Sequence, residues 1–152
     1  MSNKEEMIVV EGKIKGKARP RFNTKTGRAF TPNDTVSYEK MVRHCYMQQC
    51  GEYLNGAVRA TIYMYFKIPK SYTKKRVAAI REGLEYPMKT PDVDNCSKII
   101  LDSLNKIAYD DDQQVVELSV LKRWTEDEER IEFLLEEIGG NYEKDSRQVK
   151  RI

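Results

Sequence analysis

The chain has 152 residues, the size of one compact domain. Its 39% hydrophobic and 34% charged residues are typical of a globular protein and exclude a disordered or collagen-like chain, and three cysteines argue against a disulfide scaffold. The apolar runs are far shorter than the roughly 20 residues that span a bilayer, and 27 Lys and Arg against 24 Asp and Glu leave a net charge of only +3. We therefore expect a single-domain cytoplasmic protein with no membrane partner.

The first half of the chain predicts a strand, a basic loop, a helix and a second strand. Residues 7–11 are rich in β-branched side chains, which favours a strand. A helical pattern begins at Asp34 or Thr35, either of which can cap it, and ends before Gly51. Residues 57–68 alternate between apolar and polar side chains. This alternation predicts a strand with one face on the core and the other partly wet or shared with a partner.

The second half predicts two helices followed by two strands. A short basic helix is expected at 73–82, and a longer one at 95–107 with Asp94 as its N-cap. Strands at 115–124 and 129–138 flank a short polar connection, which predicts a C-terminal β-hairpin. The order of elements predicts an α+β fold, in which helices pack on a mixed β-sheet. We expect one domain over 1–138, followed by a polar, disordered or interacting tail at 139–152.

Two segments concentrate positive charge without any acidic residue. Residues 13–28 carry seven Lys or Arg, and residues 67–81 carry six, with aromatic side chains beside both. This combination is typical of contact with a phosphate backbone, although a solvated surface is the alternative. The residues that we expect to bind DNA are Lys17, Arg19, Arg21, Arg28, Lys74, Lys75 and Arg76.

Two groups of carboxylates indicate chemistry. Asp92 and Asp94 precede the helix predicted at 95–107, and three consecutive aspartates at 110–112 follow it. Like charges this close repel one another, so a fold that gathers them usually neutralises them with a cation. Oxygen ligands select hard cations such as Mg²⁺, and Lys98 lies one helical turn from Asp94. The pattern favours metal-assisted attack on a phosphodiester.

Other interpretations of these residues stay open or fit less well. The simplest is structural, with Asp94 as a helix cap and 110–112 as an acidic turn. An EF-hand starting at Asp92 would carry Ser97 and Ser103 where glycine and glutamate are needed. A lone histidine, His44, is too little for a zinc site with His and Cys ligands, and no phosphate-binding glycine motif predicts a nucleotide cofactor.

Several motifs together resemble those of a known family. The order is PDVDNCSK at 91–98, LDSLN at 101–105 and DDQQV at 111–115, preceded by KARPRF at 17–22 and GRAFTP at 27–32. In sequence and spacing these motifs resemble the RusA family of Holliday-junction resolvases. The resemblance covers roughly residues 8–124, and the C-terminal tail lies outside it.

The resemblance implies a homodimeric endonuclease that makes paired nicks in a four-way DNA junction, in recombination and repair, using Mg²⁺ or Mn²⁺. By position, Asp92, Asp94 and Asp112 correspond to the aspartates of the metal site, Lys98 to an essential lysine and Asp111 to an accessory carboxylate. It also implies a prophage setting. The hypothesis for the mechanism is that these aspartates hold the metal while Lys98 stabilises charge on the phosphate or the leaving oxygen.

Three rival functions share part of this pattern. A non-catalytic protein that binds DNA junctions would use the carboxylates only to cap and solvate. A metal-dependent nuclease for flaps or plain duplex would share the site but not the substrate. A Ca²⁺-binding module is disfavoured by Ser97 and Ser103.

Overall fold

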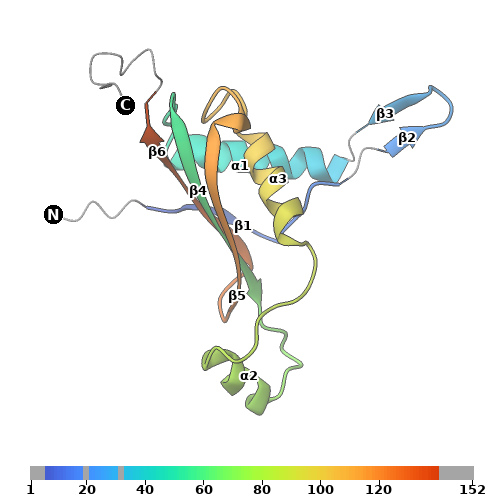
Figure 1. Ribbon diagram of the computed structural model, residues 1–152. Helices are drawn as coiled ribbons and strands as arrows, with labels where there is room; N and C mark the ends of the chain where they lie inside the picture. Colours follow the sequence, from blue (N-terminus) through green and yellow to red (C-terminus); the bar gives the residue numbers. More distant parts are fainter. Residues whose placement is uncertain (1–5, 19–20, 31–32, 141–152) are drawn as a thin grey trace.

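The computed structural model describes residues 6–18, 21–30 and 33–140 (Figure 1). A four-stranded mixed sheet forms its centre, and a small two-stranded sheet projects from it. In chain order the elements are β1 (Ile8–Glu11), β2 (Arg21–Asn23), β3 (Arg28–Phe30), α1 (Asn33–Gln49), β4 (Ala57–Lys67), α2 (Lys74–Arg81), α3 (Val93–Ser103), the 3₁₀ turn η1 (Asp112–Gln114), β5 (Val115–Thr125) and β6 (Arg130–Gly139). The predicted α+β fold with a mixed sheet is confirmed.

The central sheet has the strand order β1-β6-β4-β5, with β5 parallel to β4 and β6 antiparallel to both of its neighbours. Helices α1 and α3 lie against the same face of the sheet (Figure 1). α1 packs beside β1, and α3 packs beside both α1 and β5. β5 is therefore an edge strand whose inner side is covered by α3.

Alternation along β4 produces the core, as the sequence predicts. The side chains at alternate positions of its inner face are at most 1% exposed: Val58, Ala60, Ile62, Met64 and Phe66. Tyr38, Val42 and Tyr46 reach this face from α1, and Ile99 and Ile100 reach it from α3. Burying each such aliphatic or aromatic side chain contributes about 1.5–3 kcal/mol. Cys96 is fully buried among them as a small core residue.

The two C-terminal strands differ from a simple hairpin. β5 and β6 are consecutive, antiparallel and joined by the four residues 126–129, as predicted, but β4 lies between them. A connection of that length spans the roughly 10 Å of two strand spacings. The reason for the insertion is burial, because β4 is the strand with an uninterrupted apolar inner face and gains two hydrogen-bonded neighbours in the centre.

Helix α3 is shorter and starts earlier than predicted. It runs from Val93 to Ser103 with Asp92 as its N-cap, instead of from residue 95 to 107. The helix ends early because Lys106 adopts a left-handed backbone conformation, with φ of 65°, and its N–H donates to the carbonyl of Tyr109 at 2.7 Å. This bond closes a tight turn that a continuing helix could not make.

The predicted basic loop contains the β2–β3 hairpin, which projects from the body of the molecule (Figure 1). The side-chain oxygen of Asn23 accepts hydrogen bonds from the N–H groups of Lys25 and Thr26, at 2.9 and 3.2 Å. Gly27 follows with a positive φ of 70°, and its N–H donates to the Asn23 carbonyl at 2.8 Å. An Asx turn followed by a left-handed glycine reverses the chain, so local turn chemistry makes a hairpin where polarity alone predicts a loop.

Helix α2 stands at one end of the sheet, away from α1 and α3 (Figure 1). Thr73 caps it by accepting a hydrogen bond from the N–H of Arg76 at 3.2 Å. None of the eight residues of α2 is buried. The predicted short basic helix is therefore confirmed, and its cationic face is open to a partner.

No helix within the described part of the chain is long and apolar enough to cross a membrane. The predicted tail beyond residue 138 falls almost entirely on 141–152, which lie outside the described residues. The division at 138 therefore stays a prediction.

Gly56 lies where the start of β4 packs closely against the end of β6. A Cβ placed on Gly56 would lie 1.8 Å from the backbone oxygen of Gly139, whereas a Cβ on Gly139 would lie 3.8 Å from Ala57. We expect Gly56→Ala to lower the free energy of unfolding by about 1–3 kcal/mol, measured by urea denaturation. Gly139→Ala is the matched control and should change it by less than about 0.5 kcal/mol. Equal effects would contradict the close approach.

Candidate active site

The first turn of α3 presents two exposed aspartates. Asp92 occupies the N-cap position, yet its side chain makes no capping hydrogen bond. Asp94 follows in the first turn, and both residues are exposed. The helix dipole favours negative charge at this end. Among the described residues, side-chain capping therefore does not engage Asp92, and both carboxylates are open to a ligand.

The chain segment that leads to the β2–β3 hairpin lies directly against this turn. The N–H of Lys17 donates to the carbonyl of Asn95 at 3.0 Å. A Cβ on Gly16 would lie 2.9 Å from the Cβ of Pro91 and 3.1 Å from that of Asn95, so only glycine fits here without a shift. The basic hairpin and the first turn of α3 are thus joined by close packing.

Lys98 lies on the exposed part of α3, one turn after Asp94 and one turn before Asp102. Residues four apart share one edge of a helix, so these three side chains follow a single line. With a rise of 1.5 Å per residue, Asp94 and Asp102 lie about 12 Å apart along the axis. Lys98 is therefore placed between a carboxylate at each end of the helix.

A second group of carboxylates gathers at the other end of α3. Asp112 lies near the Asp102 and Asp111 carboxylates. Partial burial raises the pKa of Asp112, and the Asp102 and Asp111 carboxylates raise that pKa further. Neighbouring carboxylates repel one another unless a proton or a cation neutralises them. Asp112 is thus held where a positive charge would relieve repulsion.

The loop between α3 and β5 fixes this group in place. Asp111 caps η1 by accepting a hydrogen bond from the N–H of Gln113 at 3.2 Å, and Gln114 completes a capping box. The N–H of Asp112 donates to the side chain of Asn105 at 2.9 Å. The hydroxyl of Tyr109, fully buried beneath the loop, donates to the Leu101 carbonyl at 2.6 Å. The capping interpretation therefore accounts for Asp111, but not for Asp112.

Lys17, which is predicted to bind DNA, is paired with acidic side chains in this structure. Its ammonium is 2.9 Å from a carboxylate oxygen of Glu39 on α1 and 3.8 Å from one of Asp102. Packing of Gly16 on α3 points the next side chain at these acids. Lys17 therefore brings positive charge to the second carboxylate group in this structure.

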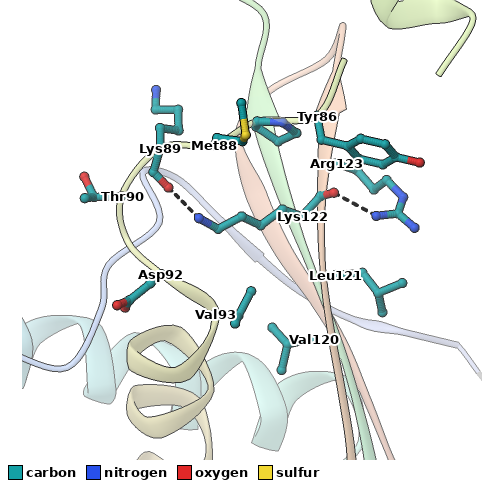
Figure 2. Close-up of a pocket in the computed structure, with 11 residues that line it drawn as sticks. Tyr86, Met88, Lys89, Thr90, Asp92, Val93, Val120, Leu121, Lys122 and Arg123 are labelled. Atoms are coloured by element: carbon teal, nitrogen blue, oxygen red, sulfur yellow. Dashed lines mark hydrogen bonds between the residues drawn. The ribbon is translucent and has the colours of Figure 1, made fainter. Parts of the chain in front are cut away.

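The structure does not bring Asp92, Asp94 and Asp112 into one cluster. Over residues 6–18, 21–30 and 33–140, no three His, Cys, Asp or Glu side chains are arranged to hold a metal ion. β5 does run back along α3, but it carries Lys122 and Arg123 to the Asp92 end (Figure 2). Asp112 stays at the start of β5. The carboxylates thus form two groups, one at each end of α3.

The chemistry of these donors nevertheless suits a hard divalent cation. Both groups offer carboxylate oxygens, which Mg²⁺ and Mn²⁺ prefer over nitrogen and sulfur ligands. Around Asp112, burial and the neighbouring carboxylates raise its pKa, and a cation bound there would reduce this repulsion. The residue types suit such an ion, with two carboxylates at the first end of α3 and three at the other.

The other predicted DNA contacts are distributed over two surfaces. Arg28 is exposed on β3, and Lys74 and Lys75 are exposed on α2. Arg76 bonds to Glu85 at 3.0 and 3.1 Å and lies 3.7 Å from the ring centre of Tyr72. Arg19 and the side chain of Arg21 lie outside the described residues.

A pocket beside Asp92 was not predicted from the sequence. It has a volume of about 690 Å³ and lies between residues 86–93 and the second half of β5 (Figure 2). Lys122 donates from its ammonium to the Lys89 carbonyl at 2.5 Å, which ties the two walls together. The sequence does contain a signal for this pocket. Lys122 occupies a position of β5 that faces the core side of the sheet, between Val120 and Trp124. A lysine at such a position indicates an opening.

Comparison with known proteins identifies the family of this chain. The family model of the endodeoxyribonuclease RusA matches residues 11–136, which include α3, η1 and both carboxylate groups. This chain belongs to the RusA endodeoxyribonuclease family. The uncharacterized protein YqaN of Bacillus subtilis (strain 168) is 33% identical over 138 residues, which are 88% of this chain and 96% of that protein. The predicted family is confirmed, and with it a nuclease of DNA.

The crowding at Asp112 predicts an effect on stability. A raised pKa means that the folded protein holds the Asp112 proton more tightly than the unfolded chain does. In metal-free buffer the free energy of unfolding should therefore fall as pH rises from the ordinary value of 3.8 through the raised pKa. The substitution Asp112→Asn removes the carboxylate that causes this fall in the free energy of unfolding. We therefore expect the variant to be more stable than the wild type at about pH 7.

The measurement is urea denaturation with EDTA at a series of pH values. Asp110→Asn is the matched control, because Asp110 is exposed in the same loop and pairs with Lys106. It should leave the pH dependence unchanged. A variant Asp112→Asn with the same pH profile as the wild type would contradict the crowding seen around Asp112.

Proposed function

We propose that this chain is a Mg²⁺-dependent endonuclease that resolves four-way DNA junctions by paired symmetric nicks, in DNA recombination and repair. The observation that carries the proposal is the first turn of α3. Asp92 and Asp94 are exposed there, Asp92 makes no capping bond, and Lys98 follows on the same edge. These unused carboxylates lie within the region that matches the endodeoxyribonuclease family. A cytoplasmic setting, in a host or a prophage, belongs to the same proposal.

The proposed metal ligands are Asp92 and Asp94 at one end of α3 and Asp112 at the other, with Asp111 as an accessory carboxylate and Mn²⁺ as an alternative to Mg²⁺. An ion held at either group would polarise a phosphate and lower the pKa of an attacking water. Asp111 keeps its capping bonds in η1 and so positions Asp112. Lys98 is proposed to stabilise negative charge on the phosphate or the leaving oxygen, because its ammonium is exposed between the two carboxylate groups.

Two cationic surfaces support DNA as the substrate. The β2–β3 hairpin carries Arg28, and α2 carries Lys74 and Lys75 at the opposite end of the molecule (Figure 1). Two cationic surfaces that project from different parts of the molecule suit separate arms of a junction better than a single groove of a short duplex. We propose that two copies act together as a homodimer, because a two-fold arrangement of two sites matches two symmetric nicks.

A non-catalytic protein that binds DNA junctions is the second candidate. It is favoured by one observation, namely that no three acidic, His or Cys side chains of the described ranges are arranged for a metal ion. A metal-dependent nuclease for flaps or plain duplex shares the proposed site and differs only in substrate. Both alternatives are separated from the main proposal by a cleavage assay.

Asp94→Asn should abolish cleavage while leaving DNA binding in place. We expect a loss of more than about 100-fold in the rate of Mg²⁺-dependent nicking of a synthetic mobile four-way junction, since even indirect metal-site changes cost 10–100-fold. Binding to the junction, measured by gel shift in EDTA, should stay within about two-fold because the phosphate contacts are untouched. Asp127→Asn, in the turn between β5 and β6, is the matched control.

The outcomes separate the candidates. Paired nicks on the junction, with none on linear duplex of the same sequence, support the resolvase. Equal cleavage of both substrates supports a general nuclease. Tight binding without nicks in either Mg²⁺ or Mn²⁺ supports the non-catalytic protein, and undiminished cleavage by Asp94→Asn sinks the proposed site.

The double variant Lys74→Ala, Lys75→Ala should weaken junction binding without altering where the nicks fall. If both ammonium groups contact phosphates, the slope of log affinity against log salt should become shallower by about two. The measurement is a gel-shift titration at several salt concentrations. Lys106→Ala, whose ammonium pairs with Asp110, is the control and should keep the wild-type slope. An unchanged slope in the double variant would remove α2 from the DNA contact.

A further inference from the structure

The pocket beside Asp92 has walls of two kinds (Figure 2). Tyr86, Met88, Val93 and residues 120–121 supply apolar and aromatic surface. Its volume of about 690 Å³ is in the range of sites that hold small organic groups. The pocket is therefore large enough for a planar ring and open enough to receive one from outside.

Cations accompany this apolar surface. Lys89, Lys122 and Arg123 all line the pocket, whereas Asp92 is the one carboxylate among its lining residues. The guanidinium of Arg123 lies 5.3 Å from the ring centre of Tyr86. An aromatic face with positive charge beside it is the combination that binds the bases of single-stranded nucleic acid, since the base stacks and the phosphate is neutralised.

Exposed apolar side chains at the pocket indicate which kind of ligand it binds. Met88 is 94% exposed and Tyr86 is 55% exposed, at the mouth of the pocket. Side chains of this kind are used by proteins that unstack DNA to contact the bases. A second copy of the chain is a poorer occupant, because a two-fold contact centred on the pocket would bring the three cations of one copy close to the three of the other.

We infer that this pocket holds a nucleobase unstacked from the DNA strand whose phosphate lies at Asp92. The base stacks on Tyr86 and contacts Met88, and Lys89 and Arg123 neutralise its flanking phosphates. Because Asp92 lines the pocket, the base is within one or two nucleotides of the cleaved bond. This inference rests on the proposed function, since it assumes that the carboxylates at α3 meet a phosphodiester.

The experiment uses the full chain and four-way junctions in which one abasic residue replaces each nucleotide near the nick in turn. Binding is measured in EDTA and cleavage in Mg²⁺. We expect one position at which the abasic residue weakens binding of the wild type by about 5- to 150-fold. Tyr86→Ala should weaken binding of the intact junction by a similar factor and should lose its sensitivity to that position. Tyr86→Phe keeps the ring and should behave as the wild type.

Leu84→Ala is the matched control. Leu84 is 73% exposed in the same loop, yet it does not line the pocket, so its removal should change neither binding nor the response to the abasic position. A fluorescence measurement on the wild type tests the same inference without any substitution. 2-Aminopurine at the same nucleotide should change its fluorescence when the wild type binds, as a base does when it leaves the stack.

Failure of this inference is distinguishable from failure of the proposed function. Normal junction cleavage with equal effects at every abasic position, or Tyr86→Ala that stays sensitive to the abasic position, overturns the base pocket and leaves the nuclease intact. Absence of both binding and cleavage by the wild type overturns both. Sedimentation of Tyr86→Ala at a lower mass than the wild type would make the pocket a subunit interface instead.

Discussion

β4 lies between β5 and β6, and the positions of the helices depend on the burial of its inner face. Alternate side chains from Val58 to Phe66 are at most 1% exposed, which requires helices on that side and a strand on each edge. Because β5 pairs with β4 in parallel, the chain must return to the start of β4 before β5 begins. α3 makes this return, so it lies antiparallel to β5 and its two ends meet opposite ends of that strand.

This arrangement places the pocket and the second carboxylate group at opposite ends of α3. The first turn of α3 faces the second half of β5 and the pocket with Lys122 and Arg123. The last turn faces η1, where the Asp102 carboxylate raises the pKa of Asp112. Lys98 lies between them on the exposed edge. In the proposed nuclease, substrate groups at the two ends of α3 would be about 12 Å apart, a length set by two turns of helix.

Local patterns predicted much of this structure, and long-range placement accounts for the rest. The alternation at 57–68 and the Thr73 cap depend on neighbours in sequence, so their elements were predicted correctly. The insertion of β4 between β5 and β6 pairs residues as far apart in the chain as Val58 with Val115 and Ala57 with Gly139, which no turn signal reports. In the same way, the residue types of the acidic groups were visible, but the pairing of Asp112 with Asp102 depends on how 104–111 folds. Lys17 faces Glu39 for a similar reason.

The packing of Gly16 on Pro91 and Asn95 limits how far the β2–β3 hairpin can travel. Lys17 is bonded to Asn95, and four residues further along the hairpin begins at Arg21, a contour of about 14 Å when fully extended. The other end returns to α1 three residues after Phe30, within about 10 Å. The β2–β3 hairpin is therefore tethered at both ends by short segments. A DNA strand bound by the hairpin would lie within a few nucleotides of the first turn of α3.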